Sequence, residues 1–179
     1  TITLEMELAA VHAIAELGVP VCRMHMLGSP QTMQQDAHYD DVLVQVRQFL
    51  TERIFACEMS GIPKKNIVID PGFGFGKQLE HNLALLANLE YFKQLGVPVL
   101  AGVSRKSMIG QITGRALEQR VVGSAAAAML AAQNGARIIR VHDVAETKDA
   151  LAMLAAVNGA KRNMTSAPAK PSIQWPDED

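Results

Sequence analysis

The sequence predicts an α/β fold with parallel strands, and within that class it favours a (β/α)₈ TIM barrel over an open sheet. Short apolar runs alternate with longer segments in which apolar residues recur at helical spacing. The runs are almost entirely apolar, as in strands buried on both faces. Polar side chains follow all four runs. A barrel can use the end of every strand in this way, whereas an open doubly wound sheet uses strands near one switch point.

The predicted strands are bounded by glycine, proline or asparagine, which commonly end strands. They cover Val19–Met24, Asn66–Ile69, Val97–Val103 and Arg137–Val141. Alternation with helices predicts parallel pairing through right-handed crossovers. A typical barrel has about 250 residues and eight strands, so we expect the chain to supply about four βα units.

Five segments beside these strands are predicted to be helical: Glu5–Leu17, Tyr39–Met59, Leu79–Leu95, Ala116–Gln133 and Ala145–Val157. The expected buried stripes are Val42, Val46, Phe49, Leu50 and Ile54 in the second segment, and Leu79, Leu83, Leu86, Leu89 and Phe92 in the third. In the fourth segment, Ala125–Ala128 suits close packing against a sheet. We expect residues 1–163 to form the half-barrel domain and the proline-containing residues 164–179 to form a mobile tail.

Composition argues against several classes of partner. A formal net charge of −1 gives no electrostatic reason to expect nucleic acid or anionic lipid. No apolar stretch of about 18 residues predicts a membrane span, and the first residues do not resemble a signal peptide. Cys22 and Cys57 lie outside any CxxC pattern. Buried free thiols in a reducing, cytoplasmic compartment are therefore expected.

The strongest local signal is Asp70-Pro-Gly-Phe-Gly-Phe-Gly-Lys77. A carboxylate at the end of a buried strand is costly to desolvate unless hydrogen-bond donors meet it, and glycines allow the backbone to approach a flat ligand. The alternative is a turn in which Asp70 accepts hydrogen bonds from the loop, and the residue chemistry alone weighs the two equally. The glycine spacing fits neither a phosphate-binding loop nor GxGxxG, so nucleotide binding is not indicated.

Two further strand ends carry cations. In Ser104-Arg105-Lys106-Ser107, hydroxyls and backbone N–H groups suit a carboxylate or phosphate; the alternative is that Ser104 caps a turn while Arg105 and Lys106 are solvated. Arg140 and His142 alternate along a strand, so both can face a barrel mouth and bind phosphate oxygens. The alternative there is an Arg140–Asp143 pair.

The first strand end is less decisive. His25 lies between two methionines, which is more typical of a core histidine than of a ligand, although it also follows a strand as the other polar residues do. No zinc-binding spacing is present, so no complete metal site is expected in this chain.

Together these segments resemble the dihydropteroate synthase family of pterin-binding enzymes. The resemblance lies in Met24-His-Met-x-Gly28-x-Pro30-x-Thr32-Met-Gln34, Asp70-Pro-Gly-Phe-Gly-Phe-Gly-Lys77, Gly102-x-Ser104-Arg-Lys-Ser107 and Ile139-Arg-Val-His-Asp143. It covers roughly residues 5–163, and the order and intervals of the four motifs make it specific. It implies a (β/α)₈ barrel in which the present strands are the fifth to eighth.

The resemblance implies a folate-biosynthetic transferase and sulfonamide target. Such enzymes condense 6-hydroxymethyl-7,8-dihydropterin diphosphate with p-aminobenzoate, release diphosphate and use Mg²⁺. We also expect a homodimer, because the predicted strands Val19–Met24 and Arg137–Val141 would be apolar and unpaired on one side. The protein ligand of Mg²⁺ would lie in the first half of the barrel, so we expect no metal ligand here and no turnover by this chain alone. Two alternatives remain open, a pterin-binding methyltransferase and a non-catalytic fragment.

The resemblance also implies roles for individual residues. Asp70 would accept hydrogen bonds from the pterin ring, and Lys106 would approach that ring. Ser104 and Ser107 would lie near the p-aminobenzoate carboxylate. The remaining substrate-binding residues would be Met24, Gly74, Phe75 and Gly102 in the pterin slot, with Arg140 and His142 on the diphosphate; Lys106, Arg140 and His142 would be catalytic.

Overall fold

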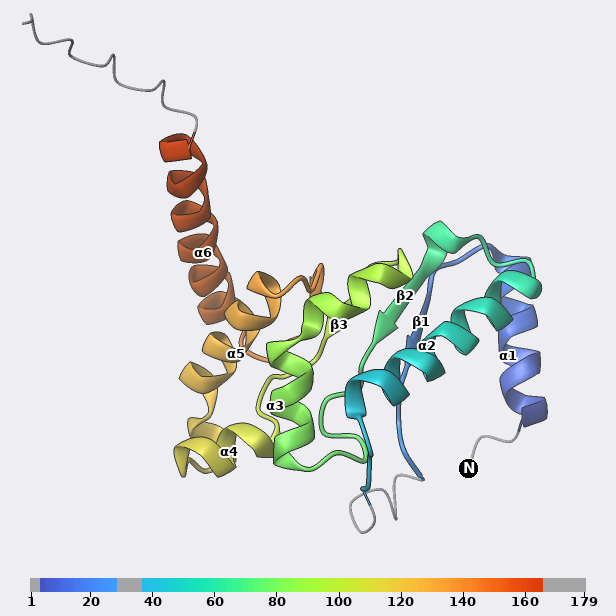
Figure 1. The fold of residues 1–179 in the computed structure, drawn as a ribbon, viewed down its shortest axis with the longest axis horizontal. Helices are drawn as coiled ribbons and strands as arrows, with labels where there is room; N and C mark the ends of the chain where they lie inside the picture. Colours follow the sequence, from blue (N-terminus) through green and yellow to red (C-terminus); the bar gives the residue numbers. More distant parts are fainter. Residues whose placement is uncertain (1–3, 29–36, 166–179) are drawn as a thin grey trace, which may run out of the picture.

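The computed structural model describes residues 4–28 and 37–165 of the chain (Figure 1). Strands and helices alternate as predicted, with short 3₁₀ helices (η) between them. In order they are α1 (Leu4–Leu17), β1 (Val21–Met24), α2 (Val42–Met59), η1 (Lys64–Asn66), β2 (Ile67–Asp70), α3 (Leu79–Ala87), η2 (Leu89–Leu95), β3 (Leu100–Ala101), α4 (Ser107–Thr113), η3 (Leu117–Gln119), α5 (Val121–Gln133), β4 (Ile138–Ile139) and α6 (Val144–Thr165). None of the described helices is long and apolar enough to cross a membrane.

The strands form two parallel pairs. β1 pairs with β2, which sets Met24 opposite Asp70, and β3 pairs with β4. A single bridge between Ile69 and Val99 joins the two pairs, so the strand order follows the chain. All four C-terminal strand ends therefore point the same way.

In residues 4–28 and 37–165, helices cover one face of this strand array and leave the other open. Ile67, Ile69 and Val99 face the helices and are at most 1% exposed. Cys22 and Ile138 lie on the opposite face and are exposed. This one-sided cover is the arrangement of a barrel wall and not of a doubly wound sheet, which has helices on both faces.

The prediction of two buried cysteines is half wrong. Cys57 in α2 is buried, but Cys22 is exposed because alternation along β1 turns it away from the helices. The two thiols, both in the described part of the chain, form no disulfide.

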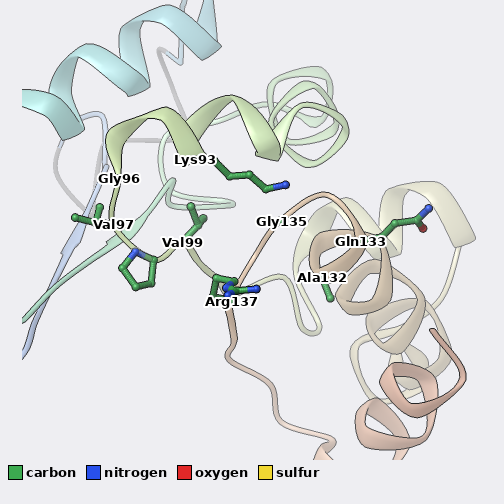
Figure 2. A pocket seen from close by; sticks show the side chains of 9 residues that line it. Lys93, Gly96, Val97, Val99, Ala132, Gln133, Gly135 and Arg137 are labelled. Carbon is green, nitrogen blue, oxygen red and sulfur yellow. The ribbon is translucent and has the colours of Figure 1, made fainter. Parts of the chain in front are cut away.

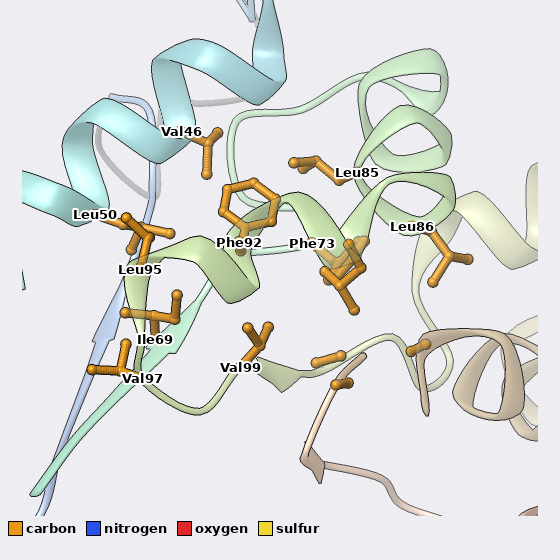
Figure 3. Close-up of a cluster of buried hydrophobic side chains, with 14 of the residues drawn as sticks. Val46, Leu50, Ile69, Phe73, Leu85, Leu86, Phe92, Leu95, Val97 and Val99 are labelled. Carbon is orange, nitrogen blue, oxygen red and sulfur yellow. The ribbon is translucent and has the colours of Figure 1, made fainter. Parts of the chain in front are cut away.

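The core lies between the strands and helices α2 and α3, with η2 packed among them (Figure 3). Helix α2 begins at Asp41, whose carboxylate accepts hydrogen bonds from the backbone N–H groups of Leu43 and Val44. The predicted stripe of α2 is confirmed: Val42, Val46, Leu50 and Ile54 are buried and Phe49 packs against them.

The third predicted helix is interrupted. Helix α3 ends at Ala87, and after Asn88 the chain continues as the 3₁₀ helix η2, which ends at Gly96 in the left-handed conformation. The stripe prediction is wrong for Leu83, which is 40% exposed, because the buried face of α3 is centred on Asn82. This polar residue faces inward because it binds the loop after β2.

Two regions singled out in the sequence fall partly outside the described residues. Helix α6 extends to Thr165, so the first two residues of the expected tail are helical, and residues 166–179 lie outside the described part. The same holds for residues 29–34 of the first motif.

Candidate functional site

The C-terminal ends of β2, β3 and β4 bring together most of the predicted site residues. Asp70, Lys106 and Arg140 lie near one another, since Arg140 contacts Asp70 and both cations act on its pKa. A cavity of about 150 Å³ adjoins them and is lined by Gly102, Ser104, Lys106, Arg140, Val141 and His142. Segments up to 70 residues apart thus meet in one place.

Asp70 is a buried carboxylate with defined partners. Its side chain is 2% exposed; Oδ1 accepts a hydrogen bond of 2.8 Å from the Gly72 N–H, and Oδ2 lies 3.3 Å from Arg140 Nη2. Burial raises the pKa of Asp70, while the Gly72 N–H, Arg140 and the more distant Lys106 and Lys77 act to lower it. The carboxylate is therefore an acceptor that a ligand with N–H groups can use.

The loop after β2 is built around the buried amino group of Lys77, whose pKa burial lowers to about 7. Lys77 Nζ donates to the carbonyls of Gly72 (3.0 Å) and Phe75 (3.1 Å) and lies 2.9 Å from His25 Nδ1. The amide of Asn82 adds a second support, because its Oδ1 accepts the Gly74 N–H at 2.7 Å. The sequence analysis assigned no role to Lys77 or Asn82. Lys77 is the last residue of the motif Asp70–Lys77, and that position could have identified it.

His25 does not face the barrel mouth, so the expectation that all four strands deliver a polar residue there is wrong for the first strand. Because Met24 lies opposite Asp70, alternation turns His25 towards α2, where its ring packs 4.9 Å from that of Phe49. It is 5% exposed and contacts Lys77. The reading of His25 as a core histidine is the one that the structure supports.

Acidification is expected to destabilise the fold through His25. Burial, assisted by the Lys77 charge, lowers the pKa of His25 from 6.5 to about 3, so the unfolded chain protonates where the folded chain does not. The stability linked to this group is complete above about pH 6.5 and is lost progressively as the pH falls towards 3. Urea denaturation across this range measures it.

His25→Asn is the matched control for this prediction. Asparagine offers Lys77 an acceptor oxygen but does not titrate. The free energy of unfolding of the variant should therefore vary less between pH 6.5 and 3 than that of the original chain. An unchanged dependence on pH would show that other groups cause the acid loss.

Phe75 and Lys106 form one wall of the site. Lys106 Nζ lies 4.1 Å from the centroid of the Phe75 ring, a cation–π contact. A Cβ at Gly74 would stand 3.2 Å from Lys106 Cδ, so glycine allows the two loops to touch. Burial, with a further contribution from Arg140, lowers the pKa of Lys106.

The loops after β3 and β4 are cross-linked. Arg105 binds Asp143 through two hydrogen bonds, and Ser104 Oγ lies 2.9 Å from His142 Nδ1. Arg105 has a φ of 55°, which costs a non-glycine residue on the order of 1–2 kcal/mol; its N–H is held by Ser124 Oγ at 2.9 Å. The structure does not show the alternative of an Arg140–Asp143 pair, because Asp143 is bound by Arg105. Arg105 is partly exposed but is paired, which differs from the alternative of a merely solvated arginine.

The remaining predicted residues take different positions around the site. Met24 packs 3.4 Å from the point where a Gly72 Cβ would stand, and Arg140 covers Gly102. Ser104 is 5% exposed and is occupied by His142, whereas Ser107, the first residue of α4, is exposed. Of the two serines, Ser107 is the accessible one.

A second cavity, of about 460 Å³, lies at the opposite ends of the strands (Figure 2). It is lined by Lys93, Gly96, Val97, Pro98, Val99, Ala132, Gln133, Gly135 and Arg137, which precede β3, precede β4 or end α5. None of the predicted site residues belongs to it.

Among the residues whose side chains the structure describes, no group of three or more histidine, cysteine, aspartate or glutamate side chains lies together. The carboxylates nearest the cavity, Asp70 and Asp143, are paired with Arg140 and Arg105.

Comparison with known proteins gives one consistent result. The family model described as pterin binding enzyme matches residues 1–142. The dihydropteroate synthase of Escherichia coli K12 is 50% identical over 157 residues, which are 88% of this chain and 56% of that protein. The chain thus spans about half the length of the curated relatives that it matches.

Solved structures agree with this. The dihydropteroate synthase of Stenotrophomonas maltophilia, with imidazole in its active site, is 56% identical with a TM-score of 0.81, covering 83% of this chain and 57% of that one. The synthase of Xanthomonas albilineans, solved in complex with 7,8-dihydropteroate, is also 56% identical, with a TM-score of 0.77, covering 84% and 55%. The fold described above is therefore similar to about half of these enzymes.

Proposed function

Since the chain belongs to the family of pterin-binding enzymes, we propose that it carries the pterin- and diphosphate-binding residues of a dihydropteroate synthase. The reaction joins 6-hydroxymethyl-7,8-dihydropterin diphosphate to p-aminobenzoate and yields 7,8-dihydropteroate and diphosphate. The observation that carries the proposal is a buried carboxylate, Asp70, beside two cations, Lys106 and Arg140, at the strand ends. A heterocycle with N–H groups and an anionic tail matches this pairing.

The pterin ring is assigned to the space between Asp70 and Lys106. Asp70 accepts ring N–H groups, which give hydrogen bonds to a charged acceptor. Lys106 and Phe75 form one wall, and the main chain at Gly74 and Gly102, with Met24, allows a flat ring to lie close.

The diphosphate is assigned to Arg140 and His142. Negative charge develops on the departing oxygen as the C–O bond to the pterin methylene breaks, and preorganised donors stabilise it. His142 bonds Ser104 through Nδ1, so Nε2 is the ring atom available for an anion. The arylamine nitrogen then forms the C–N bond and loses a proton. A path in which the leaving group departs early needs no general base.

The p-aminobenzoate carboxylate is assigned to Ser107, the accessible serine, while Ser104 positions His142 for the diphosphate. Within the whole protein we assign β1–β4 to the fifth to eighth strands of a (β/α)₈ barrel, an assignment supported by the one-sided helix cover. The exposed apolar side chains Val122 on α5 and Met153 and Val157 on α6 support a homodimer. Mg²⁺ remains an expectation from the family resemblance, and no step here passes through it.

Calorimetric titration of the purified chain with 6-hydroxymethyl-7,8-dihydropterin diphosphate tests the proposal. Saturable binding is expected. We expect dihydropteroate formation only when the part of the E. coli synthase that this chain does not match is also supplied, because misplaced catalytic groups lose orders of magnitude in rate. Absence of any saturable binding would refute the assignment of the pterin site. Turnover by the chain alone would refute the idea that catalysis needs residues outside this chain.

A further inference from the structure

The guanidinium of Arg140 lies where a pterin ring would have to reach Asp70. Its Nη2 is 3.3 Å from Asp70 Oδ2. It also lies flat against Gly102, because a Cβ on that glycine would be 2.7 Å from Nη2 and 3.1 Å from Nε. The other oxygen of Asp70 is already bonded to Gly72 N–H. A ring that lies against Gly102 while it donates to Oδ2 takes the space of the guanidinium and therefore displaces Arg140.

The two partners of this ion pair differ in their freedom to move. The Asp70 side chain is 2% exposed, whereas that of Arg140 is 57% exposed. Lys106, the other cation at this strand end, is half-buried against Phe75. Arg140 is thus the group that can leave while Asp70 stays.

A destination for Arg140 lies next to it. The cavity of about 150 Å³ is lined by Arg140, Lys106 and His142. Two cations and an imidazole in this lining suit an anionic group. An anion bound there gives the guanidinium a negatively charged partner in place of Asp70.

We propose that Arg140 is a latch that determines specificity: it covers Asp70 when no pterin is bound and transfers to the diphosphate when the substrate enters. The inference rests on the proposed function, because it takes Asp70 as the pterin acceptor. A pterin without a diphosphate must break the Asp70–Arg140 pair and supplies no anion to replace Asp70 as the partner of Arg140. After diphosphate departs, Arg140 returns to Asp70 and competes with the pterin ring of the product for its acceptor.

The test compares two ligands on Arg140→Met, which retains an apolar stem over Gly102 but removes the guanidinium. Binding of 6-hydroxymethylpterin should tighten by about threefold or more, and binding of its diphosphate should weaken by about tenfold or more. Arg137→Met, an exposed arginine at the other end of the same strand, is the matched control and should change neither affinity. If 6-hydroxymethylpterin bound Arg140→Met no more tightly than the original chain, the latch would be refuted.

A measurement without ligand separates this inference from the proposed function. The carboxyl carbon of Asp70 can be titrated by ¹³C NMR in the original chain and in Arg140→Met. The pKa of Asp70 should be higher in the variant, because Arg140 lowers it in the original chain. An unchanged pKa would refute the latch even where pterin binds; a raised pKa without any pterin binding would leave the pair established and refute the proposed ligand.

Discussion

Replacing Asp70 by asparagine is expected to weaken binding of 6-hydroxymethyl-7,8-dihydropterin diphosphate by at least about tenfold. Hydrogen bonds to a charged group contribute about 1.5–3 kcal/mol each, and about 1.4 kcal/mol corresponds to tenfold in affinity. The asparagine side chain retains one acceptor oxygen for the Gly72 N–H, so its NH₂ group would face the N–H groups of the ring. A donor then meets a donor in a buried position.

The fold should survive this substitution, so the loss can be assigned to binding. Burial raises the pKa of Asp70, which means that folding disfavours the ionised carboxylate, and a neutral amide should not lower the free energy of unfolding at neutral pH. Asp41→Asn is the control with the same change of charge, because asparagine also caps a helix. Calorimetry should give the original affinity for Asp41→Asn, and equal affinities for both variants would contradict the assigned role of Asp70.

Gly72→Ala is expected to destabilise the chain by about 3 kcal/mol or more. The residue has a φ of 74°, and an added Cβ would lie 1.8 Å from the carbonyl oxygen of His25, which is backbone and cannot rotate away. Left-handed backbone costs an alanine on the order of 1–2 kcal/mol, and overpacking adds about 1–3 kcal/mol. The loop that contains Lys77 and the β1–β2 pairing would both have to shift.

Gly61→Ala separates the two contributions. Gly61 also has a positive φ, 88°, but an added Cβ meets nothing within 4 Å, so only the backbone cost of about 1–2 kcal/mol should appear. Urea denaturation of both variants measures the difference. If Gly61→Ala were as unstable as Gly72→Ala, the contact with His25 would not be the cause.

The order and type of the elements could be predicted from the sequence because they follow from apolar periodicity. The strands proved shorter than the apolar runs: residues Val97–Val103 contain only the two-residue strand β3. The interruption at Asn88 could not be predicted, since the leucines continue through it at helical spacing. Exposure of Leu83 follows from a polar contact of Asn82 with a loop that no periodicity reveals.

The site was predictable at the level of its motifs and less so at the level of its pairs. Asp70, Lys106 and Arg140 each end or follow a predicted strand and lie near one another in the structure, while their roles stay predictions. The pairing of Arg105 with Asp143, and of Arg140 with Asp70, depends on the conformation of the loops, including the positive φ of Arg105. No sequence pattern predicts that conformation. The orientation of His25, in contrast, could have been derived by alternation from Met24 once that methionine was placed inward.

In the described residues, one bridge between Ile69 and Val99 joins the two strand pairs, and the candidate site lies across this junction. Asp70 stands on one side of this bridge, and Lys106 and Arg140 stand on the other. The Asp70–Arg140 ion pair connects the two sides without a ligand, and a substrate that binds Asp70 with its ring and Arg140 with its diphosphate would connect them in place of that pair. Any ligand that binds only the folded form adds to its stability by mass action. A bound substrate therefore connects the two strand pairs at the place where the Ile69–Val99 bridge joins them. Binding at the site should for this reason also stabilise the sheet that carries the site.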